Sequence, residues 1–176
     1  MFSASVFVSL FPLGCFPGLM RPTGPADMQY HDSYFVVAHF HYVLVPGAVF
    51  ALMAGAYYWL PKWTGHMYDE RLSKLHFWLS AISVNVLFFP MHFVGLQGMP
   101  RRIPDYALQF ADFNRIASVG GFVFGLSQLL FVYIVIKTVR GGAKATDRVW
   151  EGSHGLEWTV PSPAPYHTFA TAPEIR

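Results

Sequence analysis

The chain has 176 residues, of which 53% are hydrophobic and only 12% are charged, a composition far from the soluble average and typical of a protein built for lipid. Its net charge is only +2, and the Lys and Arg residues fall between apolar runs, so we expect no nucleic-acid partner. The single cysteine, Cys15, excludes an internal disulfide and a CxxC metal site, so metal ligands must come from histidines and acids.

Residues 1–25 begin with a long apolar stretch that has no positively charged region before it, unlike a secretory signal peptide. Pro12 and Pro17 are predicted to interrupt a helix in this stretch. We therefore interpret residues 1–25 as the atypical remnant of a membrane segment, which could still form a remnant helix.

Three apolar segments follow, within residues 26–140. The first lacks any Asp, Glu, Lys or Arg, and as a helix it would be longer than the roughly 30 Å hydrocarbon core of a bilayer. It also contains Pro46 followed by Gly47, which predicts a kink. The sequence thus predicts an all-α membrane protein in a lipid bilayer. Its three transmembrane helices are expected at about 33–61, 75–96 and 116–136.

Residues 141–176 are rich in Gly, Pro and Ser, which predicts an extended tail that depends on a partner. Seven Lys and Arg residues lie on the membrane side that carries the first connection and this tail, against four on the other side. The positive-inside rule then places the C-terminus in the cytoplasm, or in the matrix if the protein is mitochondrial.

Two histidines lie inside the first predicted span. Ionisable side chains at membrane depth are costly and usually mark function, although one such histidine could simply be a hydrogen-bonded core residue. His39 and His41 are two residues apart, which places them roughly 200° apart around a helix. Residues that chelate one ion from a single helix are three or four apart. The observed spacing therefore favours two separate iron centres, each with one axial imidazole.

His31 and Asp32 precede this span at its polar end. They could simply cap and solvate the start of the helix. Alternatively, they could belong to a site for a hard cation, Mg²⁺ or Mn²⁺, which would need further ligands or waters from elsewhere. The residues alone leave both interpretations open.

Arg101 and Arg102 lie between the second and third spans, on the side with fewer positive charges. Guanidinium groups bind carboxylates bidentately, so the pair could clamp haem propionates. Asp105 and Asp112 could instead neutralise the pair locally. Because the start of the first span and this connection emerge on the same side, the propionate interpretation gains weight.

Two long stretches carry a resemblance to a known family: HDSYFVVAHFHYVLVPGAVFA and MHFVGLQGMPRRIPDYALQFADFN. They resemble the haem-copper oxidase superfamily, specifically subunit I of aa3-type cytochrome c oxidases. The similarity runs from about Ala26 to the end of the chain and implies the last third of a bundle of about twelve spanning helices. The tail GLEWTVPSPAPYHTF is similar to bacterial members, whereas residues 1–25 fit the family poorly.

The resemblance implies roles in haem binding. His39 matches the axial ligand of the high-spin haem, haem a3, and His41 matches one axial ligand of the low-spin haem, haem a. Asp27 matches a residue near a propionate of the high-spin haem. Arg101 and Arg102 match an arginine pair that binds propionates of both haems.

The resemblance also implies partners and further metals. His31, which matches a residue near the high-spin haem propionate as well, and Asp32 match a Mg²⁺ (or Mn²⁺) site shared with subunit II. Copper B is expected in the complete subunit, but this chain carries no ligands for it. Expected partners are the rest of subunit I, subunits II and III, and cytochrome c as electron donor.

The resemblance therefore implies an oxidoreductase subunit that passes electrons from cytochrome c to oxygen and couples this to proton pumping. We expect the chain to be incomplete and inactive alone, in the inner (plasma) membrane of a bacterium or the inner membrane of mitochondria. The alternatives are a non-catalytic truncated membrane fragment, or the equivalent part of a quinol oxidase or nitric oxide reductase.

Overall fold

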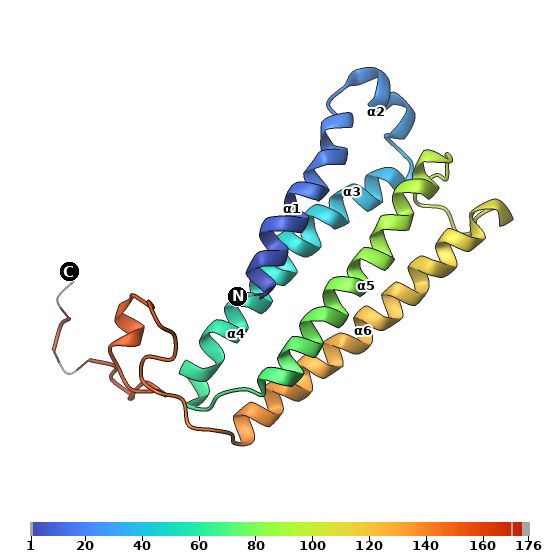
Figure 1. The fold of residues 1–176 in the computed structure, drawn as a ribbon. Coiled ribbons are helices and arrows are strands. Elements are labelled where there is room, and N and C mark those ends of the chain that lie inside the picture. Colours follow the sequence, from blue (N-terminus) through green and yellow to red (C-terminus); the bar gives the residue numbers. More distant parts are fainter. Residues whose placement is uncertain (1, 170, 174–176) are drawn as a thin grey trace.

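The computed structural model describes residues 2–169 and 171–173, and its regular structure is helical (Figure 1). Within these residues no strand forms, and only two isolated bridges occur. Two short 3₁₀ segments, Leu108–Phe110 and Leu156–Trp158, accompany the longer elements. Those elements are α1 (Phe2–Met20), α2 (Gly24–Tyr30), α3 (Tyr34–Leu44), the π-helical segment Val45–Val49, α4 (Phe50–Thr64), α5 (Glu70–Leu96) and α6 (Ala111–Arg140).

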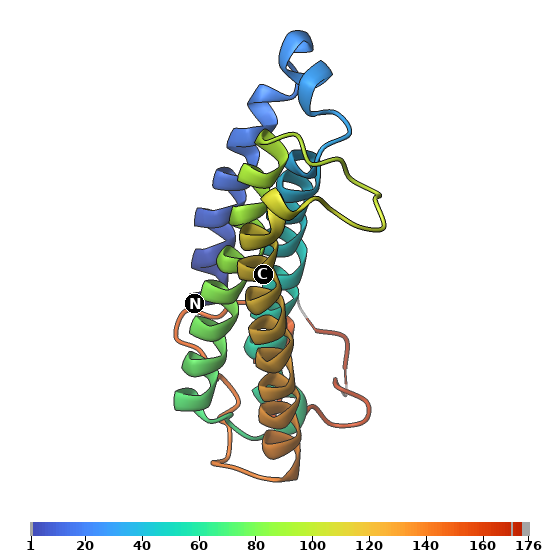
Figure 2. The same ribbon diagram turned by 90° about the vertical axis from the view of Figure 1, so that its right-hand side faces the viewer.

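Three helical stretches are long and apolar enough to cross a membrane: Tyr34–Thr64, Glu70–Leu96 and Leu108–Arg140. This confirms the predicted all-α membrane fold with three spans, whose ends differ by up to eight residues from the predicted limits. In both views α5 and α6 lie side by side along their length (Figures 1 and 2), while α1 packs on α3 and α4. The connection between α5 and α6 and the start of α3 share one end of the bundle.

α1 continues through Pro12 and Pro17, where the sequence predicts an interruption. A proline removes one backbone hydrogen bond, a loss that apolar helices tolerate when neighbouring helices pack against them. Here the neighbour is α3: a Cβ added at Gly14 would lie 2.8 Å from the carbonyl carbon of Tyr42. The backbones of α1 and α3 are therefore in close contact, which holds α1 along α3.

The predicted kink at Pro46 and Gly47 takes the form of the π-helical segment Val45–Val49, between α3 and α4. Pro46 cannot donate a backbone hydrogen bond, and a π segment accommodates such a gap by adding a residue to one turn. Pro46 is buried, so this irregular turn lies inside the bundle.

Polar side chains join the spans inside the bundle. The Tyr42 hydroxyl of α3 donates to Asn85 Oδ1 of α5, and Gln128 Nε2 of α6 lies 3.4 Å from Ser80 Oγ of α5. Asn85 and Gln128 are thus both hydrogen-bonded between spans. Hydrogen bonds between spans compensate for the cost of polar groups at membrane depth.

His76 also forms hydrogen bonds between the spans. Its side chain is only 1% exposed, with Nδ1 2.9 Å from the Tyr57 hydroxyl and Nε2 3.2 Å from Ser80 Oγ. Ser80 Oγ in turn lies 2.9 Å from Ser127 Oγ on α6. His76 therefore joins α4, α5 and α6 through hydrogen bonds.

Asp69 fixes the start of α5 and ties it to the end of α6. Its Oδ1 accepts from the backbone N–H groups of Arg71 and Leu72 at 3.1 and 3.2 Å, and its Oδ2 accepts from Lys137 Nζ at 2.8 Å. The hydrogen bond from Lys137, together with the one from Leu72, lowers the pKa of Asp69 below its ordinary value of 3.8. The carboxylate thus acts as a helix cap and as an ion-pair partner.

Asp69→Asn is expected to lower the melting temperature slightly at pH 7. The melting temperature of the variant should also decrease less steeply than that of the unaltered protein as the pH is lowered. Because the folded-state pKa is the lower one, stabilisation by this carboxylate is present above about pH 3.8 and is lost as pH falls through the folded-state pKa. Thermal unfolding in detergent from pH 7 to pH 2 measures this. If the melting temperature of the variant decreased just as steeply in acid, the Asp69 carboxylate would not be the source of this stabilisation.

The described part of the tail lies against the end of α4 and the connection between α4 and α5, whereas the sequence predicts an extended tail. Lys62 Nζ donates to the carbonyl oxygens of Asp147, at 3.1 Å, and Val160, and to Ser162 Oγ at 3.2 Å. It also lies 5.6 Å from the centre of the Trp158 ring, within range of a cation–π contact. Lys62 is only 4% exposed and is the centre of this tail attachment.

Lys62→Met should release the tail. The change leaves the buried Val160 carbonyl without its donor, at a cost of roughly 1–3 kcal/mol, so trypsin cleavage at exposed Arg148 should accelerate about tenfold or more. Lys74→Met is the matched control, because Lys74 pairs with Glu70 on the surface of α5. Equal cleavage rates in both variants would show that Lys62 does not hold the tail.

Candidate functional site

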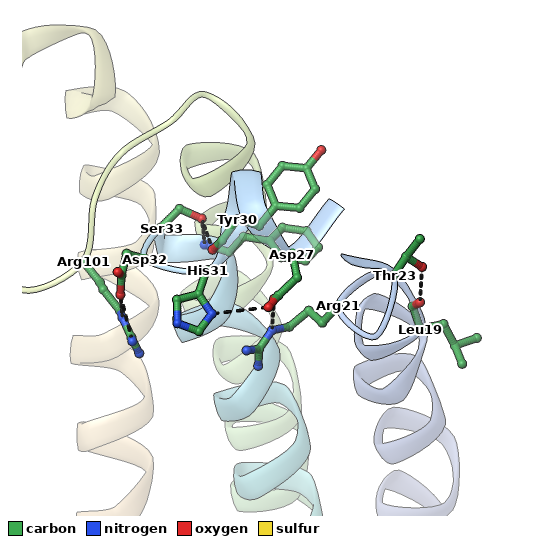
Figure 3. A network of polar contacts seen from close by, with 10 residues as sticks. Leu19, Arg21, Thr23, Asp27, Tyr30, His31, Asp32, Ser33 and Arg101 are labelled. Carbon is green, nitrogen blue, oxygen red and sulfur yellow. Dashed lines mark hydrogen bonds and ion pairs between the residues drawn. The ribbon is translucent and has the colours of Figure 1, made fainter. Parts of the chain in front are cut away.

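The predicted site residues lie on α3 and at the end of the bundle where α2, the start of α3 and the α5–α6 connection meet (Figure 3). Ser33 caps α3, since its Oγ accepts from the backbone N–H of Phe35 at 3.2 Å. The helix-capping role that the sequence left open for His31 and Asp32 therefore belongs to Ser33. The side chains of His31 and Asp32 remain available for other contacts at this polar end.

His39 is held by α1. Its Nδ1 lies 2.8 Å from the carbonyl oxygen of Gly14, and a Cβ added at Gly18 would lie only 2.8 Å from its Cε1. Because a carbonyl can only accept, Nδ1 must carry the proton, which leaves Nε2 with a free lone pair. Histidine ligands in proteins characteristically have their second nitrogen bonded in this way.

His41 has the same arrangement with different neighbours. Its Nδ1 lies 2.8 Å from the carbonyl oxygen of Val37, one turn earlier in α3, which again leaves Nε2 with a free lone pair. The imidazole stacks on Phe88 of α5, with ring centres 4.7 Å apart and planes 15° apart. The ring of Phe40 lies 4.2 Å from it at 32°.

The two imidazoles therefore contact different helices, α1 for His39 and α5 for His41, as their spacing around α3 predicts. With Nδ1 donating to a carbonyl, the neutral form of each imidazole has its lone pair on Nε2, the atom that binds haem iron in proteins. Both residues fit a pair of separate haem centres. The partners Gly14 and Phe88 were not found from the sequence, because a carbonyl acceptor and a core phenylalanine carry no local signal.

Asp27 is bonded on both sides in the short α2 region (Figure 3). Arg21 Nε donates to Asp27 Oδ1 at 3.4 Å, and His31 Nδ1 lies 3.3 Å from Asp27 Oδ2. In the neutral imidazole the carboxylate acceptor favours the proton on Nδ1, which leaves the lone pair on Nε2. Arg21 was not singled out in the sequence, and the contact across six residues reveals it.

Asp32 pairs with Arg101 across the end of the bundle. Arg101 Nε and Nη2 donate to Asp32 Oδ1 at 3.1 and 2.9 Å, and the Arg101 backbone N–H donates to the Asp32 carbonyl at 2.8 Å. The hydrogen bond from Arg101 lowers the pKa of Asp32 below its ordinary value of 3.8. Asp32 is thus ionised at neutral pH, with Oδ2 outside this pair of hydrogen bonds.

Asp105 and Asp112 do not neutralise Arg101 and Arg102, which was the alternative that the sequence left open. Asp112 forms its ion pair with Arg115, at 3.5 Å, and Asp105 accepts from the backbone N–H of Tyr106 at 2.8 Å. Arg102 is exposed, has φ = 62°, and forms no ion pair within the described residues. A non-glycine residue at positive φ is uncommon and costs some backbone strain. The Arg102 guanidinium is thus left without an ion-pair partner among the residues that the structure describes.

An open hollow of about 730 Å³ lies at this end of the bundle and is lined by Arg21, Asp27, His31 and Asp32, among other residues. The part of the chain that the structure describes contains no cluster of three His, Cys, Asp or Glu side chains able to hold a metal ion. His31 and Asp32 can therefore offer two ligands at most, and a cation here would take the others from elsewhere.

Comparisons with known proteins identify the family of the chain. The family model for "Cytochrome C and Quinol oxidase polypeptide I" matches residues 1–123, which include residues 1–25. The chain is 46% identical over 182 residues to cytochrome c oxidase subunit 1 of Yarrowia lipolytica (strain CLIB 122 / E 150), covering 94% of this chain and 34% of that protein. It is 44% identical over 170 residues to the subunit 1 of Cereibacter sphaeroides, covering 96% and 30%.

A solved structure of a heme-copper terminal oxidase dimer has a similar fold, with a TM-score of 0.69 at 20% identity, over 81% of this chain and 27% of that one. The chain spans about a third of the length of the curated relatives that it matches. The family resemblance carried by the two stretches around His39 and Arg101 is confirmed. Because the family model matches more than half of the sequence, the chain belongs to the cytochrome c and quinol oxidase polypeptide I family.

Proposed function

We propose that this chain is a part of the catalytic subunit of a respiratory oxidase, in which His39 binds the iron of the high-spin haem and His41 that of the low-spin haem. The observation that carries the proposal is the pair of imidazoles on α3, each with Nδ1 at 2.8 Å from a backbone carbonyl. In the neutral imidazole this leaves the lone pair of each Nε2 for an axial bond. The haems, when bound, supply the electron transfer and oxygen chemistry.

The arginines and acids at the end of the bundle would hold the charged edges of the haems. Arg102, which has no ion-pair partner within the described residues, would bind a propionate directly. Arg101 would share its guanidinium between Asp32 and a propionate, and Asp27 would lie near the high-spin haem. His31 and Asp32 would give a Mg²⁺ or Mn²⁺ ion two ligands, with others from subunit II.

In the complete complex, this chain would lie beside the rest of subunit I, which supplies the copper B ligands, and beside subunits II and III. Electrons would come from cytochrome c, and their flow to oxygen would be coupled to proton pumping. The surplus of Lys and Arg would place the C-terminus in the cytoplasm of a bacterium, or in the mitochondrial matrix. One curated relative is from a yeast and the other from a bacterium, which supports both locations.

Reconstitution tests the proposal. The chain is co-expressed with the preceding part of subunit I and with subunits II and III, and oxygen uptake is measured with reduced cytochrome c and with a quinol. The proposal predicts two haem signals and uptake driven by cytochrome c. The family description also includes quinol oxidases, so uptake driven by quinol alone would reassign the donor. An assembled complex without haem would refute the proposal.

A further inference from the structure

The ring of His41 is constrained on three sides. The carbonyl of Val37 binds Nδ1 at one edge, and the rings of Phe40 and Phe88 contact the imidazole. A hydrogen bond at one atom directs Nε2 but permits the ring plane to tilt about the line through that bond. The aromatic contacts are therefore what fix the plane of the imidazole.

The two phenylalanines differ in whether they belong to the same helix as His41. Phe40 is the chain neighbour of His41 and moves with the same backbone, and its ring is inclined by 32°. Phe88 belongs to α5, is only 8% exposed, and lies nearly parallel to the imidazole, at 15° with centres 4.7 Å apart. Such a parallel pair resists rotation of either ring out of the stack. Phe88 thus restrains the plane of His41 from outside α3.

The position of Phe88 is itself set by the contact between α3 and α5. One turn before Phe88, Asn85 accepts the hydroxyl hydrogen bond of Tyr42, the residue after His41. Two turns after Phe88, Gly95 lies against the backbone of Phe35. Phe88, Tyr42 and Val84 also share one buried apolar cluster. The register of α5 along α3 therefore places the Phe88 ring over His41.

We propose that Phe88 is a positioning residue for His41: by stacking on the imidazole, it sets the orientation of the axial ligand plane at the low-spin haem. This inference rests on the proposed function of His41. The orientation of an axial imidazole sets its π overlap with the iron orbitals, and contacts around a ligand tune the metal that it binds. His39 is held by α1 instead, so α5 tunes one haem and α1 the other.

The test uses the assembled oxidase complex with Phe88→Leu, which removes the stacked ring. The proposal predicts a changed spread of g values in the EPR signal of the low-spin haem and a shifted midpoint potential for that haem. The spectrum of the high-spin haem should stay as it is in the unaltered complex. Phe88→Tyr, which keeps a ring, should restore the g values.

Phe89→Leu is the matched control, because it makes the same change on the next residue of α5, whose side chain is 55% exposed. It should leave the g values and the potential unchanged. An unchanged low-spin signal in assembled Phe88→Leu, or the same change in Phe89→Leu, would overturn the proposal. Phe88→Met also lacks a ring, and its unbranched, flexible side chain adapts to the space differently from leucine, so it replaces the leucine variant if that does not assemble.

The proposal can also be tested on the unaltered complex, by determining its structure. An experimental structure should show the His41 ring stacked on Phe88, and an imidazole rotated away from Phe88 would overturn the inference. If His41 binds no haem at all, the proposed function fails first, and this is visible before any variant is compared.

Discussion

His41→Ala should remove the low-spin haem from the assembled complex and leave the high-spin haem, whereas His39→Ala should do the reverse. The physical reason is that each ring contacts its own helix, α5 or α1, so one imidazole can be lost without moving the other. Haem content should fall from two to about one per complex, because an iron loses an axial bond. Pyridine haemochrome assays and optical spectra measure this.

His92→Ala is the control for these variants, since His92 lies on α5 with Nδ1 3.3 Å from the carbonyl of Phe89, and its ring packs against Phe35 and Tyr42. It should keep both haems. If either His39→Ala or His41→Ala erased both haem signals while the complex still assembled, the assignment of one ligand to each centre would be wrong.

Gly95→Ala should separate α3 from α5 and strongly destabilise the bundle. A Cβ at this position would lie 2.0 Å from the backbone nitrogen of Phe35 and 2.5 Å from its Cα, so a backbone has to move. Overpacking of this kind costs about 1–3 kcal/mol, and more where a rigid backbone is the obstacle. The melting temperature should fall by several degrees or more, as measured by scanning calorimetry in detergent.

Gly125→Ala makes the same change on α6, where an added Cβ would meet nothing within 4 Å. Because alanine is favoured over glycine in a helix by about 1 kcal/mol, this control should be neutral or slightly stabilising. The two variants together separate helix contact from helix propensity. Gly95→Ala with an unchanged melting temperature would contradict the close contact between α3 and α5.

The parts of the fold that depend on local composition could be predicted from the sequence. Apolar runs of sufficient length gave three spans, and the spacing of His39 and His41 gave their different directions, because both follow from helix geometry. The family comparison confirmed the resemblance carried by the stretches around these residues. The roles assigned to His39, His41 and Arg102 stay predictions.

The contacts that join distant segments could not be predicted in this way. Asp32 and Arg101 are 69 residues apart, and the sequence suggested nearer acids as partners for the arginines. Likewise, nothing near Lys62 in the sequence indicates that it holds the tail, because its acceptors come from about 100 residues further on. Pro12 and Pro17 were predicted to interrupt α1, which continues because α3 packs closely against it.

An experimental structure of the complete oxidase, determined with its haems, tests the central claim most directly. The account predicts that Nε2 of His39 and Nε2 of His41 each bind a different iron, on opposite sides of α3, with both Nδ1 atoms still at their carbonyl partners. Two imidazoles that converge on one metal ion, or that face lipid in the assembled complex, would contradict it.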